Sequence, residues 1–204
     1  MTAARFHNVR LRRYSSVPVL ADAPKNPPRA SSGGARIAPV PELVAELAAG
    51  RMIVLMDDED RENEGDLVVA AQKVTADQIN FMLKHARGLV CMPMTEDRLA
   101  RLGLRMMVAE NASPFGTAFT VSIDARAVRN RGITASGRAD TIRRAAEPDA
   151  DAGEFVVPGH VFPLRARPGG VLVRTGQTEG AVDLCRLAGL EPPKRVQVHG
   201  WLLL

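Results

Sequence analysis

Seven carboxylates crowd into ten consecutive residues, which lie between two apolar runs and read Asp57-Asp58-Glu59-Asp60-Arg61-Glu62-Asn63-Glu64-Gly65-Asp66. Like charges at this spacing repel one another, and a hard divalent cation relieves that repulsion. Mg²⁺ binds one or two carboxylates and keeps water or substrate oxygens in its other positions. We interpret the segment as a divalent-metal site in which Arg61 binds an anion or clamps the neighbouring acids. A solvated acidic loop is the alternative.

A second candidate site is the segment Arg174-Thr175-Gly176-Gln177-Thr178, which follows an apolar run and precedes a helical pattern. Backbone amides at a helix N-terminus, together with an arginine and threonine hydroxyls, form a cradle that suits a phosphate group. The alternative is an ordinary strand-to-helix turn in which Thr178 is the N-cap.

A third candidate is His160, which stands between turn-forming residues in Pro158-Gly159-His160-Val161-Phe162-Pro163. Histidine can act as a general acid or base near neutral pH, although a lone histidine is also common as a structural residue. Taken together, the three segments supply what proton abstraction next to a sugar ketone requires. The metal polarises the carbonyl, the cradle positions the phosphate, and the histidine or a carboxylate moves protons.

Strands and helices that alternate irregularly must position these groups. The patterns predict helices over 41–50, 75–88, 95–103 and 178–187, and strands over 52–56, 67–71, 89–94, 117–123 and 170–174. Thr75 and Gln78 form a capping box, and Gly88 is expected to end that helix. We therefore predict an α/β fold, a single layered domain with a mixed sheet flanked by helices.

Charge divides the chain near residue 40. Residues 1–40 contain seven arginines and lysines against one acid, Asp22, so the basic character of the chain belongs to this segment. We expect residues 1–40 to be a disordered basic extension. A transit peptide, or a start codon assigned too far upstream, is the alternative. The remainder is mildly acidic and poor in aromatic residues, which argues against a nucleic-acid partner, and none is expected.

No apolar run approaches the length of a membrane span, so no membrane partner is expected. The two cysteines, Cys91 and Cys185, show neither a metal-binding spacing nor a disulfide framework. A cytoplasmic location is therefore expected.

The acidic run resembles the signature loop of the 3,4-dihydroxy-2-butanone 4-phosphate synthase family. The resemblance extends over roughly residues 41–191, and its segments include Arg87-Gly88-Leu89-Val90-Cys91, Thr95-Glu96-Asp97-Arg98, Gly116-Thr117-Ala118-Phe119-Thr120-Val121, Pro158 to Arg165 and Gly169-Gly170-Val171-Leu172. It implies a lyase of riboflavin biosynthesis that converts D-ribulose 5-phosphate to formate and L-3,4-dihydroxy-2-butanone 4-phosphate, using Mg²⁺ or Mn²⁺, and it implies a homodimer.

The resemblance also implies roles for particular residues. Glu62 matches a metal ligand, and Arg61, Glu62 and Asp66 match substrate contacts. The segment Arg174, Thr175, Gly176, Gln177 and Thr178 matches the substrate-phosphate segment, and His160 matches the essential histidine of the family.

Two departures from the family pattern lie inside the expected site. Gln177 stands where the family has a histidine that is its second metal ligand. A glutamine carbonyl can coordinate Mg²⁺ but is a poorer Mn²⁺ ligand than imidazole, so weakened metal binding is expected. Gly137 replaces an aspartate, so a polar contact near the site is expected to be lost or moved to Asp140.

The third departure follows Pro192. Relatives continue with a strand that supplies a catalytic glutamate and with a further helix, whereas no acidic residue follows Glu191 here. We therefore expect a family-like domain over 41–192 and a truncated C-terminal part with an atypical tail over 193–204. The missing strand is expected to leave an apolar sheet edge exposed. Little lyase activity is expected as a result. A non-catalytic paralogue that binds sugar phosphate or partners an active subunit is the alternative.

Overall fold

The computed structural model describes residues 37–58, 60–190 and 197–202. Its helices are α1 Val40–Ala48, α2 Ala76–His85, α3 Glu96–Arg101, α4 Ala135–Ala146 and α5 Gln177–Leu187. Its strands are β1 Ile53–Met56, β2 Gly65–Ala70, β3 Arg87–Met94, β4 Ile123–Ala125, β5 Phe155–Arg165 and β6 Gln197–Leu202. Residues 1–36 of the extension expected over 1–40, and the boundary expected at 192, lie outside the described residues. No helix in the described part of the chain is long and apolar enough to cross a membrane.

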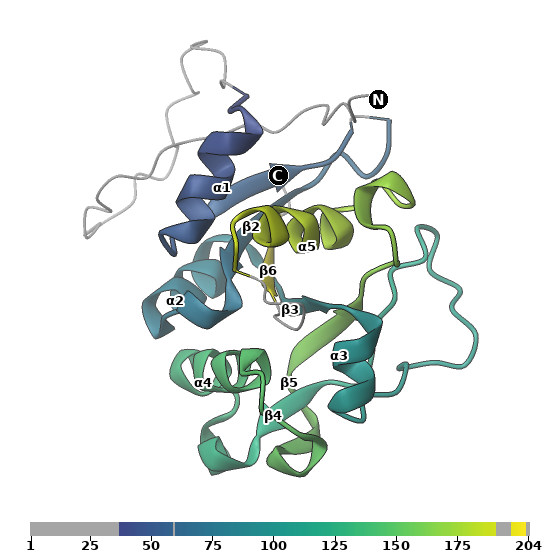
Figure 1. Cartoon of the computed structure of the whole chain (residues 1–204). Coiled ribbons are helices and arrows are strands. Elements are labelled where there is room, and N and C mark those ends of the chain that lie inside the picture. Colours follow the sequence, from purple (N-terminus) through teal and green to yellow (C-terminus); the bar gives the residue numbers. More distant parts are fainter. Residues whose placement is uncertain (1–36, 59, 191–196, 203–204) are drawn as a thin grey trace, which may run out of the picture.

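The strands form one mixed sheet in the order β1-β2-β6-β3-β5-β4 (Figure 1). The β3–β5 pair is parallel, and the other neighbouring pairs are antiparallel. The predicted fold class, an α/β domain whose mixed sheet is flanked by helices, is confirmed.

Strand β2 shows how the core is divided between the two faces of the sheet. Leu67 and Val69 belong to an apolar cluster that also contains residues of α2 and α4. Val68 and Ala70 belong to a second cluster, shared with α1 and α5. Successive strand residues point to opposite faces, so β2 is buried along its whole length. This double burial explains why residues 67–70 of β2 form a continuous apolar run rather than an alternating pattern.

Threonine side chains cap the N-termini of three of the helices. Thr75, Thr95 and Thr134 each accept a hydrogen bond from the backbone N–H three residues on, at the start of α2, α3 and α4. The predicted capping box of Thr75 and Gln78 is complete. Such caps satisfy N–H groups that have no partner inside the helix. The helix α5 differs, because Gly176 precedes it without a side-chain cap.

The expectation of a missing strand after Glu191 is wrong. Residues Gln197–Leu202 form β6, which pairs antiparallel with both β2 and β3 in the middle of the sheet. Asp66 faces Trp201 in the register of β2 and β6. The apolar edge that we expected to be uncovered is therefore paired. The prediction failed because strand pairing depends on backbone hydrogen bonds, which any side-chain pattern without proline can make.

Three expected elements differ from the structure. Residues 170–174 form a short 3₁₀ helix, η4 (Gly170–Leu172), and a turn instead of a strand. The run 117–123 makes only isolated bridges, and a regular strand begins at Ile123. The helix α2 ends at His85, and Gly88 lies inside β3. The apolar residues of the first two segments were interpreted as a strand pattern. A short apolar run does not by itself distinguish a strand from a short helix or an irregular segment.

Besides β6, two further elements were not predicted. His160 was expected between turn residues but lies inside β5, the longest of the described strands. The helix α4, whose first turn contains Gly137, was also missed. Prolines at 158 and 163 and glycine at 159 masked the strand, because these residues ordinarily mark turns.

Candidate functional site

Asp57 organises the acidic loop between β1 and β2. Its two carboxylate oxygens accept the backbone N–H groups of Glu62, at 3.2 Å, and Glu64, at 3.0 Å. The same carboxylate binds the Arg61 side chain, and Asp57 is buried. Asn63 adopts a left-handed conformation with φ of 52°, a turn that asparagine tolerates better than most residues. Asp57 and the backbone of Glu62 and Glu64 are therefore held in a defined turn.

The Arg61 guanidinium is the centre of this cluster. Its Nη1 atom lies 2.5 Å from Asp57 Oδ2, 2.9 Å from Glu62 Oε2 and 3.2 Å from Gln177 Oε1. The guanidinium also lies over the Phe115 ring, 5.3 Å from the ring centroid, within the range of a cation–π contact. Residues from three distant parts of the chain thus meet on one cation.

Gln177 reaches this cluster as the first residue of α5. It is 5% exposed, and its Nε2 atom donates to the carbonyl oxygen of Glu64 at 3.4 Å. That bond directs Oε1 toward Arg61 and fixes which end of the amide faces the acidic loop. The predicted ligand pair, Glu62 and Gln177, is therefore brought together by the fold.

The donor set fits a magnesium ion better than a transition metal. Glu62 Oε2 and Gln177 Oε1 both lie within 3.2 Å of one nitrogen, so the two oxygens already converge on one point. No group of three or more His, Cys, Asp or Glu side chains arranged to hold a metal occurs among the residues that the structure describes. One carboxylate and one carbonyl oxygen, completed by water, suit Mg²⁺.

Crowded acids surround this point. The pKa of Glu64 is raised by burial and by the neighbouring charges of Glu62, Asp66 and Asp57. Asp66 is completely buried at the start of β2. Additional positive charge near the loop would stabilise the ionised acids.

The Arg174 guanidinium is held in place by two other residues. Its Nη1 atom donates to Glu179 Oε2 at 2.5 Å, and its Nη2 atom donates to the carbonyl oxygen of Phe115 at 3.2 Å. Glu179 is fully buried, and its other oxygen accepts the N–H of Arg167 at 2.9 Å. Because Arg61 also contacts Phe115, the acidic loop and the Arg174 segment are joined through this residue.

The rest of the predicted cradle surrounds the start of α5. Thr175 is exposed, whereas Gly176 and Thr178 are buried. A side chain at Gly176 would come within 2.3 Å of Arg174 Nη1, so this guanidinium position requires glycine. Thr178 is not the N-cap, since α5 begins at Gln177. The first amides of α5 therefore have no side-chain cap and are available to an anion.

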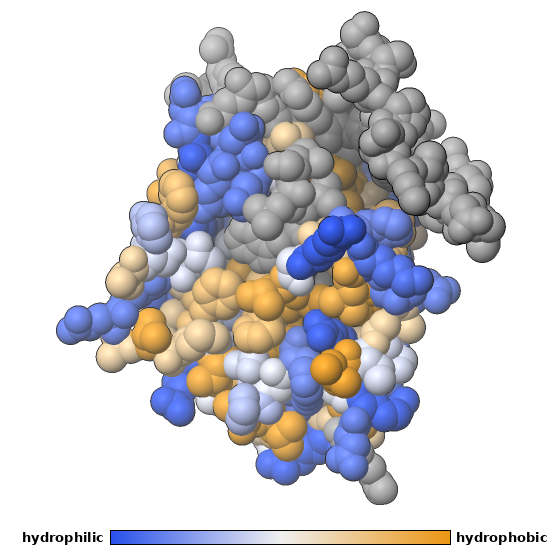
Figure 2. Space-filling model, turned by 180° about the vertical axis from the view of Figure 1, so that it is seen from behind, coloured by the Kyte–Doolittle hydropathy of each residue, from blue (hydrophilic) through white to orange (hydrophobic). Residues whose placement is uncertain are grey.

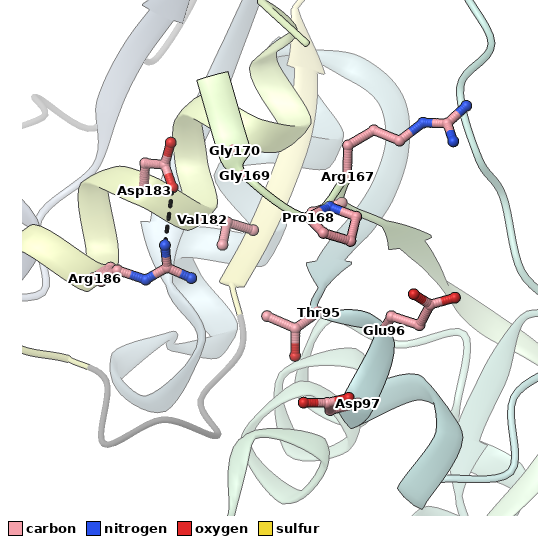
Figure 3. A pocket seen from close by; sticks show the side chains of 11 residues that line it. Thr95, Glu96, Asp97, Arg167, Pro168, Gly169, Gly170, Val182, Asp183 and Arg186 are labelled. Atoms are coloured by element: carbon pink, nitrogen blue, oxygen red, sulfur yellow. Dashed lines mark hydrogen bonds and ion pairs between the residues drawn. The ribbon is translucent and has the colours of Figure 1, made fainter. Parts of the chain in front are cut away.

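A cavity of about 340 Å³ lies between α3 and α5 (Figure 3). Asp183 faces it from α5 and binds Arg186, while Thr95 and Asp97 face it from the start of α3. Asp183 also accepts the N–H of Val171 at 2.9 Å. The loop that leads to Arg174 is therefore fixed by two buried or half-buried acids of α5, Glu179 and Asp183.

His160 forms a pair with an aspartate on the neighbouring strand. Its Nδ1 atom lies 2.6 Å from Asp124 Oδ2, and its backbone N–H donates to Asp124 Oδ1 at 3.0 Å. The Asp124 side chain is 8% exposed and the His160 side chain 42% exposed. This geometry fixes the ring and leaves Nε2 directed away from the aspartate, as a residue that exchanges protons requires.

Close backbone packing makes this pair possible. A Cβ atom at Gly159 would lie 2.0 Å from the carbonyl carbon of Ile123, and one at Gly132 would lie 2.0 Å from Asp124 Oδ2. Both glycines therefore let β4, β5 and the segment after β4 approach the carboxylate. The sequence signal of Gly159 was read as turn propensity, which hid this role.

The structure does not bring His160 into contact with the acidic loop. His160 lies on β5, which β3 and β6 separate from β2 in the sheet. No contact between His160 and Arg61, Glu62 or Gln177 is found in the described part of the chain. The predicted site residues thus form two groups, one around Arg61 and one around His160.

The Gly137 departure has a local explanation. The N–H of Gly137 donates to the Thr134 cap at 3.0 Å, and a Cβ atom there would lie 1.9 Å from the carbonyl oxygen of Arg131. This turn excludes any side chain at 137. Asp140 does not replace the lost contact, because its carboxylate pairs with Arg143 on the same helix.

Sequence reasoning missed four residues that shape the site. They are Asp57 as the centre of the loop, Phe115, Asp124 and Glu179. Asp124 had a weak signal, since an acid directly after an apolar run can face a neighbouring strand. Phe115 had none, because its contacts come from segments far away in the sequence.

Known proteins match about three quarters of this chain or more. The family model of 3,4-dihydroxy-2-butanone 4-phosphate synthase matches residues 41–198. Proteins named 3,4-dihydroxy-2-butanone 4-phosphate synthase are 58% identical over 153 residues in Pseudomonas aeruginosa and 54% identical over 156 residues in Neisseria meningitidis serogroup B. These matches include 75% and 76% of this chain but 42% and 43% of the relatives. The chain therefore spans about two fifths of the length of these curated relatives.

Solved structures give the same result. A 3,4-dihydroxy-2-butanone 4-phosphate synthase in complex with two magnesium ions is 47% identical, with a TM-score of 0.76, over 80% of this chain and 74% of that one. A two-domain synthase from A. baumannii is also 47% identical with a TM-score of 0.76, over 82% of this chain and 48% of that one.

Proposed function

Because the chain belongs to the 3,4-dihydroxy-2-butanone 4-phosphate synthase family, we propose that it is a lyase of riboflavin biosynthesis that converts D-ribulose 5-phosphate to L-3,4-dihydroxy-2-butanone 4-phosphate and formate. The observation that carries the proposal is the meeting of Glu62, Gln177 and Arg61 at one point, with Arg174 joined to them through Phe115. A phosphorylated sugar needs both a cation site and an anion site within one small region.

Glu62 and Gln177 would hold the divalent ion, and Mg²⁺ or Mn²⁺ is the proposed cofactor. When bound, the ion supplies a Lewis acid for the substrate carbonyl oxygen. Gln177 contributes a neutral oxygen rather than an imidazole nitrogen, which favours Mg²⁺ over Mn²⁺ relative to a histidine at this position. The buried Nε2–Glu64 bond keeps that oxygen directed at the site.

Arg174 and the start of α5 would bind the substrate phosphate. Glu179 and the Phe115 carbonyl each take one donor group of Arg174 and thereby fix its plane. The remaining donors of the guanidinium and the uncapped amides of α5 face an anion together. Arg61 and Asp66 are proposed to contact the sugar portion.

His160 would move a proton at its Nε2 atom. In the neutral ring, the carboxylate of Asp124 requires the proton on Nδ1, which leaves Nε2 as the acceptor. Asp124 would therefore act as a positioning residue.

Formate release from D-ribulose 5-phosphate in the presence of Mg²⁺ tests the proposal. We expect Glu62→Gln to lower the rate about 100-fold or more, because it removes the charge that holds the ion. Glu42→Gln, in the first turn of α1 and outside both groups of predicted site residues, is the matched control and should leave the rate unchanged. Sugar-phosphate binding without any formate release would instead favour a non-catalytic paralogue.

A homodimer is also proposed. Apolar side chains are exposed on the strands next to the His160 pair, namely Leu89 at 46% and Val157 at 50%. Figure 2 shows hydrophobic residues gathered across the middle of one face, and contiguous exposed apolar surface of this kind commonly marks a protein interface. Light scattering at micromolar concentration should give twice the mass of the chain, and a monomer would contradict the proposal. A cytoplasmic location remains part of the proposal.

A further inference from the structure

Arg61 occupies the convergence point of the proposed metal ligands. Its Nη1 atom is within hydrogen-bond distance of Glu62 Oε2 and of Gln177 Oε1, the two oxygens assigned to the metal. Its Nη2 atom also contacts Glu62 Oε1, at 3.3 Å. Both carboxylate oxygens of Glu62 are therefore engaged by one guanidinium, whose side chain is only 17% exposed.

A metal ion and this guanidinium cannot share that point. Mg²⁺ requires its oxygen ligands at about 2.0–2.1 Å, a position that overlaps the nitrogen now bound by the same oxygens. Two positive charges at such a separation also repel strongly in a partly buried site. Metal binding therefore requires Arg61 to leave Glu62 and Gln177.

The surroundings of Arg61 offer a second position for the guanidinium. The Phe115 ring lies beneath it at 5.3 Å, and the carbonyl oxygen of Phe115 binds Arg174. An anion bound at Arg174 would attract the Arg61 guanidinium toward the phosphate cradle and away from Glu62. Asp57, which binds the same nitrogen but is not a proposed ligand, would keep the loop folded through its two backbone N–H bonds.

We propose that Arg61 is an internal competitor of the metal ion, and that an anion bound in the cradle relieves this competition, so that metal and anion bind with positive coupling. This inference rests on the proposed metal site of Glu62 and Gln177. Removing Arg61 is therefore expected to strengthen metal binding, whereas removing a residue that simply binds the ligand would weaken it. Linkage requires the coupling to be reciprocal, so the metal must also tighten the anion.

The test measures Mn²⁺ binding to the full chain by calorimetry and by the loss of the free-ion EPR signal. Sulfate serves as the anion, since it is a tetrahedral dianion that leaves manganese soluble, with sodium chloride at matched ionic strength as the control. We expect sulfate to tighten Mn²⁺ binding by about fivefold or more in the unmodified protein. We expect Arg61→Met to bind Mn²⁺ about tenfold more tightly without sulfate, and to show no sulfate effect.

Two further variants keep the test decisive. Arg51→Met removes an exposed arginine that pairs with Glu46 beside α1, and it should leave Mn²⁺ binding unchanged. If Arg61→Met fails to fold, as judged by circular dichroism, Arg61→Lys replaces it. Lysine keeps the charge without the fork of donors, so we expect an intermediate Mn²⁺ affinity and a reduced sulfate effect.

The outcomes separate this inference from the function on which it rests. Measurable Mn²⁺ binding that is equal or weaker in folded Arg61→Met overturns the competition but leaves the metal site standing. The absence of Mn²⁺ binding in every protein, with and without sulfate, overturns both. Tighter binding in Arg61→Met that retains the full sulfate effect overturns the coupling.

Discussion

Replacement of Asp124 by asparagine should change the tautomer of the neutral His160 ring, moving its proton from Nδ1 to Nε2. The backbone N–H of His160 donates to Asp124 Oδ1 at 3.0 Å, and this donor cannot change. An asparagine must therefore turn its carbonyl oxygen to the backbone and its NH₂ group to Nδ1 of the ring. Nδ1 then has to accept a hydrogen bond, so the neutral ring carries its proton on Nε2, the atom that the proposed mechanism needs unprotonated.

The size of the effect follows from the two contacts. The ring bond at 2.6 Å involves a charged acceptor that is 8% exposed, but the His160 side chain is 42% exposed. Hydrogen bonds to charged groups contribute about 1.5–3 kcal/mol, and the solvated ring places the loss in stability toward the lower end of that range. A proton-transfer residue contributes about 100- to 10,000-fold to a rate, so the loss in kcat should far exceed the loss in stability.

Nitrogen NMR of the histidine ring measures the tautomer directly, and urea unfolding measures the stability. Formate release gives the rate where turnover is present. Asp140→Asn is the matched control, because Asp140 pairs with Arg143 on α4 and has no contact with His160. The reasoning is refuted if folded Asp124→Asn keeps the proton on Nδ1, or if its kcat equals that of the unmodified protein.

Three further predictions follow from the geometry. Gln177→His should raise Mn²⁺ affinity about tenfold or more, because imidazole is the better ligand; equal affinities in a metal titration would contradict this. Gly159→Ala should lower the free energy of unfolding, measured in urea titrations, by about 3 kcal/mol or more, since its Cβ would meet backbone atoms at 2.0–2.3 Å. The control is Gly180→Ala, whose Cβ would have a leucine methyl at 3.1 Å as its nearest neighbour, and it should change that free energy by less than about 1 kcal/mol. Arg144 lowers the pKa of Glu154 through their hydrogen bond, so this pair stabilises the fold above the ordinary glutamate pKa and the contribution is lost as the pH falls through the lowered pKa. Arg144→Met should therefore show a lower urea midpoint at pH 7 and approach the unmodified protein as the pH falls below that lowered pKa, and parallel curves at all pH values would exclude the mechanism.

Local sequence determined the elements whose signals involve only near neighbours. The capping box of Thr75 and Gln78 specified the start of α2, because both of its hydrogen bonds join residues three apart. The apolar runs of β1 and β2 were equally readable, since each strand is short and largely buried. The acidic loop identified the family, because its residues are consecutive.

Long-range packing decided the remainder. The place of β6 in the centre of the sheet depends on pairing with β2 and β3, whose residues are more than a hundred positions away. Strand β5 forms despite its prolines and glycine, because Gly159 allows β4 to approach closely. Sequence order cannot encode such contacts in a local pattern.

The candidate site shows the same division. The residue types at Glu62, Gln177, Arg174 and His160 were evident from the sequence. Only the tertiary structure showed that Arg61 lies between the two proposed ligands and that His160 is paired with Asp124. The physical reason is that the sequence fixes which charges are present, whereas the free energy of bringing them together depends on distances that are set when the sheet and α5 pack.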